Sequence, residues 1–422
     1  SAPLGPPHIL PHPAIDAMRR CFADISRATT RPVARAPDVA RRGFGDVARA
    51  SPARPAGSGR AAATAVGGRK TRGAPQFRNS AEDTQWSSEQ TWYTKEKTYQ
   101  FLKHKTVSVI GAPLAAGQHQ LGVEKGPQLI REGGLAAVAK QLGWKMEDLG
   151  DLDLEGEAAK FEGETSMPQV RNCEQIGLAN KLIHDTVKRE AKKGNFVLTL
   201  GGDHSVGSAT VSGMKAVHED LCVVWIDAHA DSNTPASSPS GNYHGMSAAH
   251  VLNWIRPPLP GWEWLKQEHT IKESRLAFIG LRDVDMYERQ MLRDSGVAVF
   301  TMHEVDRYGI GEVVDMALHR INPHSDRPVH LSFDIDAVDP TFAPGTGTCS
   351  RGGLSFREAH YICERLSMTN NLTSMDLVEV NPTLDLPIPP RMHGDSGTVT
   401  AELQTVWLAI ELISSALGRT IL

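Results

Sequence analysis

The stretch VVWIDAHADSNTP, residues 223–235, joins an apolar run to a series of polar side chains. The run 223–226 predicts a buried strand, because continuous β-branched and aromatic residues are typical of a strand covered on both faces. Asp227, His229 and Asp231 follow at every second position, and alternate residues of an extended segment point the same way. The stretch therefore predicts a parallel strand whose end presents three ligand-type side chains together.

Similar apolar runs recur along the chain, separated by segments with helical spacing. Strands are expected at 105–113, 196–200, 221–227, 275–283, 297–305, 328–336 and 372–382. Helices are expected at 126–144, 173–193, 207–219, 286–295, 309–321, 355–369 and 398–417. This alternation predicts an α/β fold with a parallel sheet of at least six strands between two layers of helices.

The first 95 residues differ from the rest in composition. Residues 1–80 hold thirteen arginines and one lysine against four aspartates, a formal charge of +10. Such a basic, low-complexity segment buries too little apolar surface to offset its ordering entropy, so residues 1–95 are expected to form a disordered extension before a domain at 96–422. Within it, the apolar spacing at 15–25 predicts a basic amphipathic helix, which is typical of a transit peptide. The alternatives are a basic tail without an address and an arm that tethers the protein to nucleic acid or membrane.

Bulk properties exclude several classes of protein. The 422 residues carry a net charge of −4, so nothing draws the chain as a whole to nucleic acid. No apolar run approaches the length needed to cross a bilayer, which predicts no membrane helix. The five cysteines are scattered without a C-x-x-C pair, which argues against a disulfide framework and a cysteine zinc site.

Other expected strands also end in ligand-type residues. His204 follows 196–200, Asp334 and Asp336 end 328–336, and Glu379 ends the apolar part of 372–382. Ligands bind at the carboxyl ends of strands in α/β sheets, so these side chains are expected to meet at one edge. Two histidines and four aspartates form an oxygen-rich set that favours Mn²⁺ or a similar ion over structural zinc, and six ligands suit two ions.

A lone aspartate after a strand usually caps the next helix, and a lone histidine there is usually a core residue. Six such groups at one edge would repel and desolvate one another without a cation. Asp203 and Asp339 are interpreted as capping or supporting groups.

These residues lie in motifs that resemble the ureohydrolase family and, within it, the arginases. The matching motifs are GGDHS (201–205), DAHADSNTPASSPSGNYHG (227–245), GLRDVD (280–285), SFDIDAVDPTFAPGTGT (332–348) and DLVEVNP (376–382). The resemblance covers about residues 105–420. It implies a three-layer α/β/α fold with a central, mostly parallel eight-stranded sheet, two Mn²⁺ ions per subunit, and a homotrimer or hexamer.

The resemblance also assigns the site residues and the reaction. One ion would be held by His204, Asp227, Asp231 and Asp334, and the other by His229, Asp227, Asp334 and Asp336. A hydroxide bridging the ions would convert L-arginine and water to L-ornithine and urea. Asp231, His244 and Glu379 are the implied catalytic residues: Asp231 passes a proton to the departing amine, His244 exchanges protons with solvent, and Glu379 pairs with the guanidinium.

Implied substrate contacts are Asn233, Ser240, Asn242, Asp285, Glu288 and Thr348. Asn233, Ser240 and Asn242 are short polar residues of the loop 231–245. Without the resemblance, they are interpreted as turn formers. Ser232, Tyr243, the segment 246–250 and Gly345 depart from common arginase residues. The alternatives are an agmatinase or other guanidine hydrolase, and a catalytically silent paralogue that binds arginine. The expected location is mitochondrial, with the cytoplasm or a plastid as alternatives.

Overall fold

The computed structural model describes residues 102–421 except 104, 162, 164–165 and 389–401. The expected amphipathic helix at 15–25 and the expected domain boundary at 95 lie outside the described residues, so both stay predictions.

The centre of the fold is a sheet of eight parallel strands, which confirms the expected architecture. The strands are β1 (Thr106–Ala112), β2 (Lys145–Asp151), β3 (Phe196–Gly201), β4 (Cys222–Ile226), β5 (Leu276–Leu281), β6 (Ala298–Thr301), β7 (Val329–Asp334) and β8 (Leu372–Val378). Their order is β2-β1-β3-β8-β7-β4-β5-β6. The strands β3, β8, β7 and β4, which precede the ligand-type residues, are therefore immediate neighbours in the middle of the sheet.

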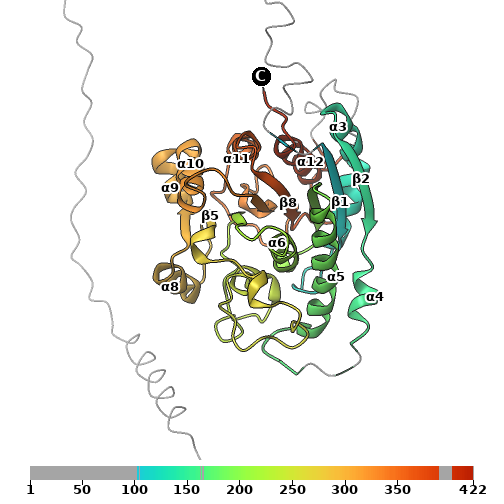
Figure 1. Ribbon diagram of the computed structural model, residues 1–422, viewed down its shortest axis with the longest axis vertical. Coiled ribbons are helices and arrows are strands. Elements are labelled where there is room, and N and C mark those ends of the chain that lie inside the picture. The colour runs from blue at the N-terminus through green and yellow to red at the C-terminus, as the bar shows by residue number, and fades with distance from the viewer. Residues whose placement is uncertain (1–101, 104, 162, 164–165, 389–401, 422) are drawn as a thin grey trace, which may run out of the picture. The chain divides into compact units, whose positions relative to one another are not determined.

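Helices cover both faces of this sheet (Figure 1). They are α2 (Gly126–Ile130), α3 (Ala136–Gln141), α4 (Leu154–Ala158), α5 (Cys173–Lys192), α6 (Gly207–Lys215), α7 (Ser247–Val251), α8 (Met286–Asp294), α9 (Met302–Tyr308), α10 (Ile310–Ile321), α11 (Phe356–Met368) and α12 (Gln404–Ala416). Strand β4 shows the division: Val224 and Ile226 pack in the core with α10, α11 and α12, while Val223 and Trp225 pack in the core with α5, α6 and α7.

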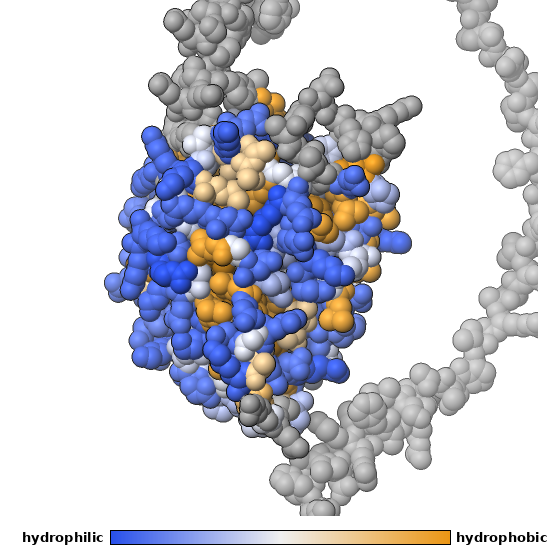
Figure 2. Space-filling model, turned by 90° about the vertical axis from the view of Figure 1, so that its right-hand side faces the viewer, coloured by the Kyte–Doolittle hydropathy of each residue, from blue (hydrophilic) through white to orange (hydrophobic). Residues whose placement is uncertain are grey.

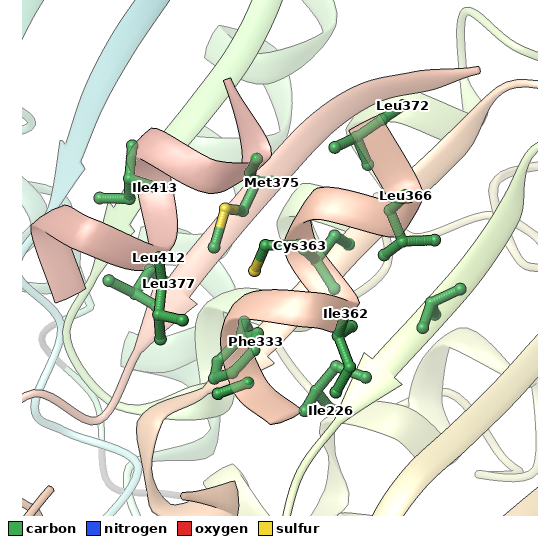
Figure 3. Close-up of a cluster of buried hydrophobic side chains, with 14 of the residues drawn as sticks. Ile226, Phe333, Ile362, Cys363, Leu366, Leu372, Met375, Leu377, Leu412 and Ile413 are labelled. Atoms are coloured by element: carbon green, nitrogen blue, oxygen red, sulfur yellow. The ribbon is translucent and has the colours of Figure 1, made fainter. Parts of the chain in front are cut away.

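Figure 3 shows part of the first core, where side chains of α11 and α12 meet those of the central strands. Phe333 and Leu377 come from β7 and β8, and Ile362 and Leu412 come from the two helices; all four are fully buried. Burying side chains of this size stabilises the fold by roughly 1.5–3 kcal/mol each. The packed core fixes the strands, and hence the residues that follow them.

Two elements differ from the sequence prediction. Strand β2 was not predicted, because it lies at the sheet edge and its side chains are exposed or half-buried, so no apolar run marks it. The predicted strand 297–305 is wrong beyond Thr301, where α9 begins. Thr301 and Glu304 form a capping box at this point. The Thr-x-x-Glu pattern was present in the sequence and predicts a helix start.

Gly345, one of the departures from common arginase residues, has a local explanation. A Cβ at this position would lie 2.7 Å from the Cβ of Asp385. The Asp385 carboxylate accepts hydrogen bonds from the backbone N–H groups of Thr405 and Val406 in the first turn of α12. Glycine at 345 therefore leaves room for the aspartate that caps α12.

The face that carries β2 and α4 is mostly hydrophilic, with apolar residues in small separate patches (Figure 2). Within the described part of the chain, no helix is long and apolar enough to cross a membrane.

Candidate active site

The structure brings the six expected metal ligands together at the carboxyl ends of β3, β7 and β4, in the middle of the sheet. His204 opens a single 3₁₀ turn after β3, and Asp227 directly follows β4. Asp334 is the last residue of β7, and Asp336 lies in the short turn after it. Because these strands are parallel and lie within one run of four, β3-β8-β7-β4, residues separated by more than one hundred positions share one site.

His204 lies at the centre of the first group of ligands. Its Nδ1 atom is 3.2 Å from an oxygen of Asp227 and 3.1 Å from oxygens of Asp231 and Asp334. A ring nitrogen carries at most one hydrogen, so it cannot satisfy three carboxylates, and Oδ2 of Asp231 accepts no hydrogen bond within the described residues. A divalent cation satisfies this arrangement of buried oxygens and one imidazole nitrogen, so the residues present fit a metal site.

His229 forms a second group with Asp227 and Asp336. Its Nδ1 lies 3.1 Å from an oxygen of Asp336 and 3.5 Å from Oδ1 of Asp227. Asp227 thus belongs to both groups, with one oxygen directed to each histidine. A carboxylate shared in this way is what a bridging ligand between two cations requires.

The pKa values of the site reflect the crowded charges of its own side chains. Burial raises the pKa of Asp231 to about 6, and the neighbouring Asp227 adds to this. Burial lowers the pKa of His204, but the carboxylates of Asp227, Asp231 and Asp334 around Nδ1 together outweigh burial and raise it well above the usual value. The carboxylates repel one another, and the imidazoles are driven toward their charged form. A bound cation would relieve both effects.

Supporting residues that the sequence analysis missed orient the ligands. The indole Nε1–H of Trp225 donates to Oδ2 of Asp227 at 3.0 Å, and Ser332 Oγ lies 2.9 Å from Nε2 of His204. Trp225 precedes Asp227 by two residues, so strand periodicity alone could have placed the two on one face. Ser332 gave no comparable signal, since a serine in a strand has many uses.

Buried Glu379 and half-buried His244 form a pair beside the ligands. His244 Nδ1 lies 3.1 Å from Oε1 of Glu379, which also accepts a hydrogen bond from the backbone N–H of His204. Gln118, a residue without any signal in the sequence, donates from Nε2 to the other carboxylate oxygen at 2.8 Å. Burial lowers the pKa of His244, but the hydrogen bond to Glu379 and the negative charges of Glu379, Asp231 and Asp203 together outweigh burial and raise it to about 9.

Two of the carboxylates belong to residues in the left-handed backbone conformation, which residues other than glycine rarely adopt. The φ angles of Asp231 and Glu379 are +46° and +62°. The carbonyl of Asp231 accepts hydrogen bonds from Ala248 and Ala249 at the start of α7, and the N–H of Glu379 donates to Gly202. Left-handed non-glycine residues gather at functional sites, where the surroundings hold them in place.

A cavity of about 220 Å³ opens above this centre. Its walls contain the following expected substrate contacts: Asn233, Ser240, Asn242, Asp285, Glu288 and Thr348. Asn233 Nδ2 donates to Oδ2 of Asp285 at 2.9 Å, so these two residues form one polar wall. Thr348 instead donates to Asp336, an expected ligand. Glu379 does not line the cavity and lies beneath it.

Comparison with known proteins agrees with this geometry. Residues 105–417 match the model of the arginase family. An arginase of Schizosaccharomyces pombe is 42% identical over 322 residues, which cover 76% of this chain and 95% of the yeast protein. The chain belongs to the arginase family. Human mitochondrial arginase-2 is 40% identical over 75% of this chain and 85% of its own length. The crystal structure of Bacillus subtilis arginase is 36% identical, matches with a TM-score of 0.64, and is covered completely by 75% of this chain.

Ser232, one of the residues that depart from common members of the arginase family, contacts a residue of the cavity wall. Ser232 donates from both its backbone N–H and its hydroxyl to Oε1 of Glu288. Glu288 also accepts from the N–H of Asp285, as part of the capping box of α8. Burial raises the pKa of Glu288 to about 7. Glu288 therefore joins the loop that carries Asn233 to the helix end that carries Asp285.

Proposed function

We propose that this member of the arginase family hydrolyses L-arginine to L-ornithine and urea with two Mn²⁺ ions. The observation that carries the proposal is the pair of ligand groups around His204 and His229 that share Asp227. We assign one ion to His204, Asp227, Asp231 and Asp334, and the other to His229, Asp227, Asp334 and Asp336. When bound, two such ions acidify a shared water and stabilise negative charge that develops on the substrate.

The chain's own residues have separate tasks in this proposal. Glu379 provides a buried carboxylate that pairs with the guanidinium and holds its carbon above the ions. In the described structure Glu379 bonds to His244 and Gln118, so the arriving guanidinium replaces part of this pairing. Asp231 delivers a proton to the departing amine, and His244 exchanges protons between the site and solvent.

The cavity wall favours arginine over a guanidine without amino-acid groups. Asp285 offers a carboxylate to the α-ammonium group. Asn233, Ser240 and Asn242 offer polar groups to the α-carboxylate, and Thr348 supports this wall through Asp336. A site built to pair with such groups discriminates against a substrate that lacks them, because its polar groups are then left unpaired.

A substrate panel tests this proposal. Protein loaded with Mn²⁺ is given arginine, agmatine and guanidinobutyrate, and urea release is measured. We expect release from arginine at least about 100-fold faster than from agmatine, since the lost pairing corresponds to a few kcal/mol. Release from agmatine alone would replace the proposal with the agmatinase alternative. Arginine binding without ornithine formation would establish the silent paralogue instead.

We also propose that the basic N-terminal extension directs the protein to mitochondria, as the name of the human relative suggests for that protein. The cytoplasm and a plastid remain the alternatives. A homotrimer or hexamer is proposed from the family resemblance. Fusing residues 1–95 to a fluorescent protein tests the first point, and light scattering tests the second.

A further inference from the structure

A chain of buried polar groups runs from His204 away from the cavity and into the sheet. Nε2 of His204 lies 2.9 Å from Ser332 Oγ, and Ser332 Oγ donates to Oδ1 of Asp376 at 2.7 Å. The other oxygen of Asp376 accepts from Thr210 Oγ1 at 2.5 Å and lies 3.0 Å from Nε2 of His330. All five side chains belong to residues that are at most 1% exposed. Each buried polar group costs free energy to desolvate, and the hydrogen bonds between these groups offset that cost.

Strand pairing holds this chain in a fixed register. Ser332 on β7 is the direct cross-strand neighbour of Asp376 on β8, and His330 is the neighbour of Ser374. His330, Ser332 and Asp334 alternate along β7, so the three side chains leave the same face of the sheet. The polar chain is therefore continuous with the proposed metal site at the strand end.

The directions of the hydrogen bonds from His204 through Ser332 to Asp376 follow from the end at His204. Nδ1 faces the three carboxylates, so a cation held there takes the lone pair of Nδ1 and leaves the ring hydrogen on Nε2. Nε2–H then donates to Ser332 Oγ, and the single hydroxyl hydrogen of Ser332 donates onward to Asp376. Asp376 can accept from three donors at once only as a carboxylate.

The surroundings support the ionised form of Asp376. Burial raises the pKa of this carboxyl, but the contact with His330, the charge of His204 and the hydrogen bond from Thr210 together outweigh burial, and the pKa lies below its usual value. A carboxylate that accepts a hydrogen bond increases the polarity of the donor, and this effect passes through Ser332 to the imidazole.

We infer that Asp376 is a positioning residue for one of the two cation sites: through Ser332 it fixes the ring orientation and hydrogen position of His204. Removing the Asp376 carboxylate weakens binding of the ion held by His204 and leaves the affinity for the ion held by His229 unchanged. Within the part of the chain that the structure describes, His229 has no equivalent series of buried partners: its Nε2 lies 3.9 Å from Asp283, whose side chain is 70% exposed. This inference rests on the proposed two-ion site. It adds that Asp376 supports the affinity for the ion at His204 and not the affinity for the ion at His229.

Titration of metal-free protein with Mn²⁺ by calorimetry tests the inference, because it resolves two binding constants without any assay of activity. Asp376→Asn preserves size and an acceptor for Ser332 but removes the charge. We expect one binding constant to fall by about 10-fold, the lower end of the effect of a residue that supports a metal ligand, and the other to stay constant. Thr210→Val is the matched control: it removes one hydrogen bond to Asp376 and leaves the path to His204 intact, so both constants stay close to wild type.

A double-mutant cycle separates positioning from a general structural effect. Ser332→Ala is expected to weaken the same binding constant, and Asp376→Asn added to Ser332→Ala is expected to have no further effect. A merely structural role of Asp376 would persist in the Ser332→Ala background. Unfolding of the metal-free variants is followed by circular dichroism; if Asp376→Asn does not fold, His330→Asn replaces it, with a smaller loss expected at the same constant.

The outcomes distinguish this inference from the proposed function. If wild-type protein binds fewer than two ions, the two-ion proposal fails. If wild-type protein binds two ions and Asp376→Asn changes neither constant, or changes both equally, the inference about Asp376 is overturned. The inference is also overturned if the effect of Asp376→Asn is undiminished in the Ser332→Ala background.

Discussion

His244 shows how one residue of this site depends on its immediate partner. The ring is half-buried on the cavity wall, and its contact with Glu379 determines its charge. Among the surrounding protein groups alone, the pKa of the His244 ring is about 9, so the ring is protonated below about pH 9. Divalent cations nearby disfavour the imidazolium and lower this pKa toward neutrality. With the proposed ions bound, we therefore expect His244 to ionise between about pH 7 and 9.

Replacing His244 with asparagine tests this role. We expect His244→Asn to lower kcat by about 100-fold, the usual contribution of general acid–base catalysis, while both Mn²⁺ ions stay bound. The kcat profile should also lose an ionisation between about pH 7 and 9 that the wild type shows. The control is His319→Asn, which alters an exposed histidine of α10. A metal content that falls with kcat would assign His244 to the metal site instead.

At the residue scale, the sequence predicted the residues that meet at the site better than the residues that support them. Asp227, His229 and Asp231 could be predicted because an apolar run ended in evenly spaced polar residues. Gln118 could not, because its contact with Glu379 spans 261 positions and only the fold brings them together. The left-handed backbone of Asp231 is set by the first turn of α7, which no local pattern around Asp231 reveals.

At the scale of elements, the turn Tyr243–Met246 and helix α7 are held by a buried polar cluster. The Tyr243 hydroxyl lies 2.6 Å from Nδ1 of His250 and 2.8 Å from Ser208 Oγ on α6. The Tyr243 ring stacks on Trp262 with centroids 4.6 Å apart. Tyr243 and His250 are both departures from common arginase residues, and in the structure they form one hydrogen-bonded pair.

Removing the hydroxyl of Tyr243 should therefore destabilise the protein. We expect Tyr243→Phe to lower the free energy of unfolding by about 1–3 kcal/mol, because His250 and Ser208 lose a buried partner. Burial lowers the pKa of His250 to about 3, so the ring is neutral and the loss should not change between about pH 5 and 8. Denaturant unfolding measures the effect, with Tyr308→Phe at an exposed tyrosine as control.

Combining Tyr243→Phe with His250→Leu provides the cross-check. Replacing both partners by apolar groups removes the unpaired nitrogen, so the double variant should lose less than the sum of the single losses. Strict additivity would show that the two side chains stabilise the loop independently.

The same scale shows where pattern reading failed. Runs such as 196–200 and 221–227 located central strands because burial on both faces makes them uniformly apolar. The edge strand β2 lacks that burial. Its sequence therefore contains exposed polar residues and no uniformly apolar run that would predict a strand. Helix α9 was hidden by apolar residues that continue from β6, although the capping box at Thr301 marked the change.

At the scale of the whole molecule, the order of strands creates the site. The placement of β8 and β7 between β3 and β4 brings His204 and Asp227 to the same centre as Asp334. The sequence predicted a parallel sheet with ligands at one edge, and the family resemblance supplied the number of strands. Neither the register between strands nor the polar chain behind His204 could be predicted, because both depend on contacts between distant segments.

Counting Mn²⁺ ions per chain against ornithine formation tests the central claim most directly. The account predicts two ions per wild-type chain with equal amounts of ornithine and urea from arginine. Asp227→Ala, which removes the carboxylate shared by both ligand groups, should bind fewer than two ions and form no detectable ornithine. The control is Asp339→Asn, since Asp339 accepts hydrogen bonds from Thr341, Gly352 and Gly353 and should leave both ions bound. An Asp227→Ala variant that keeps two ions and full turnover would contradict the account.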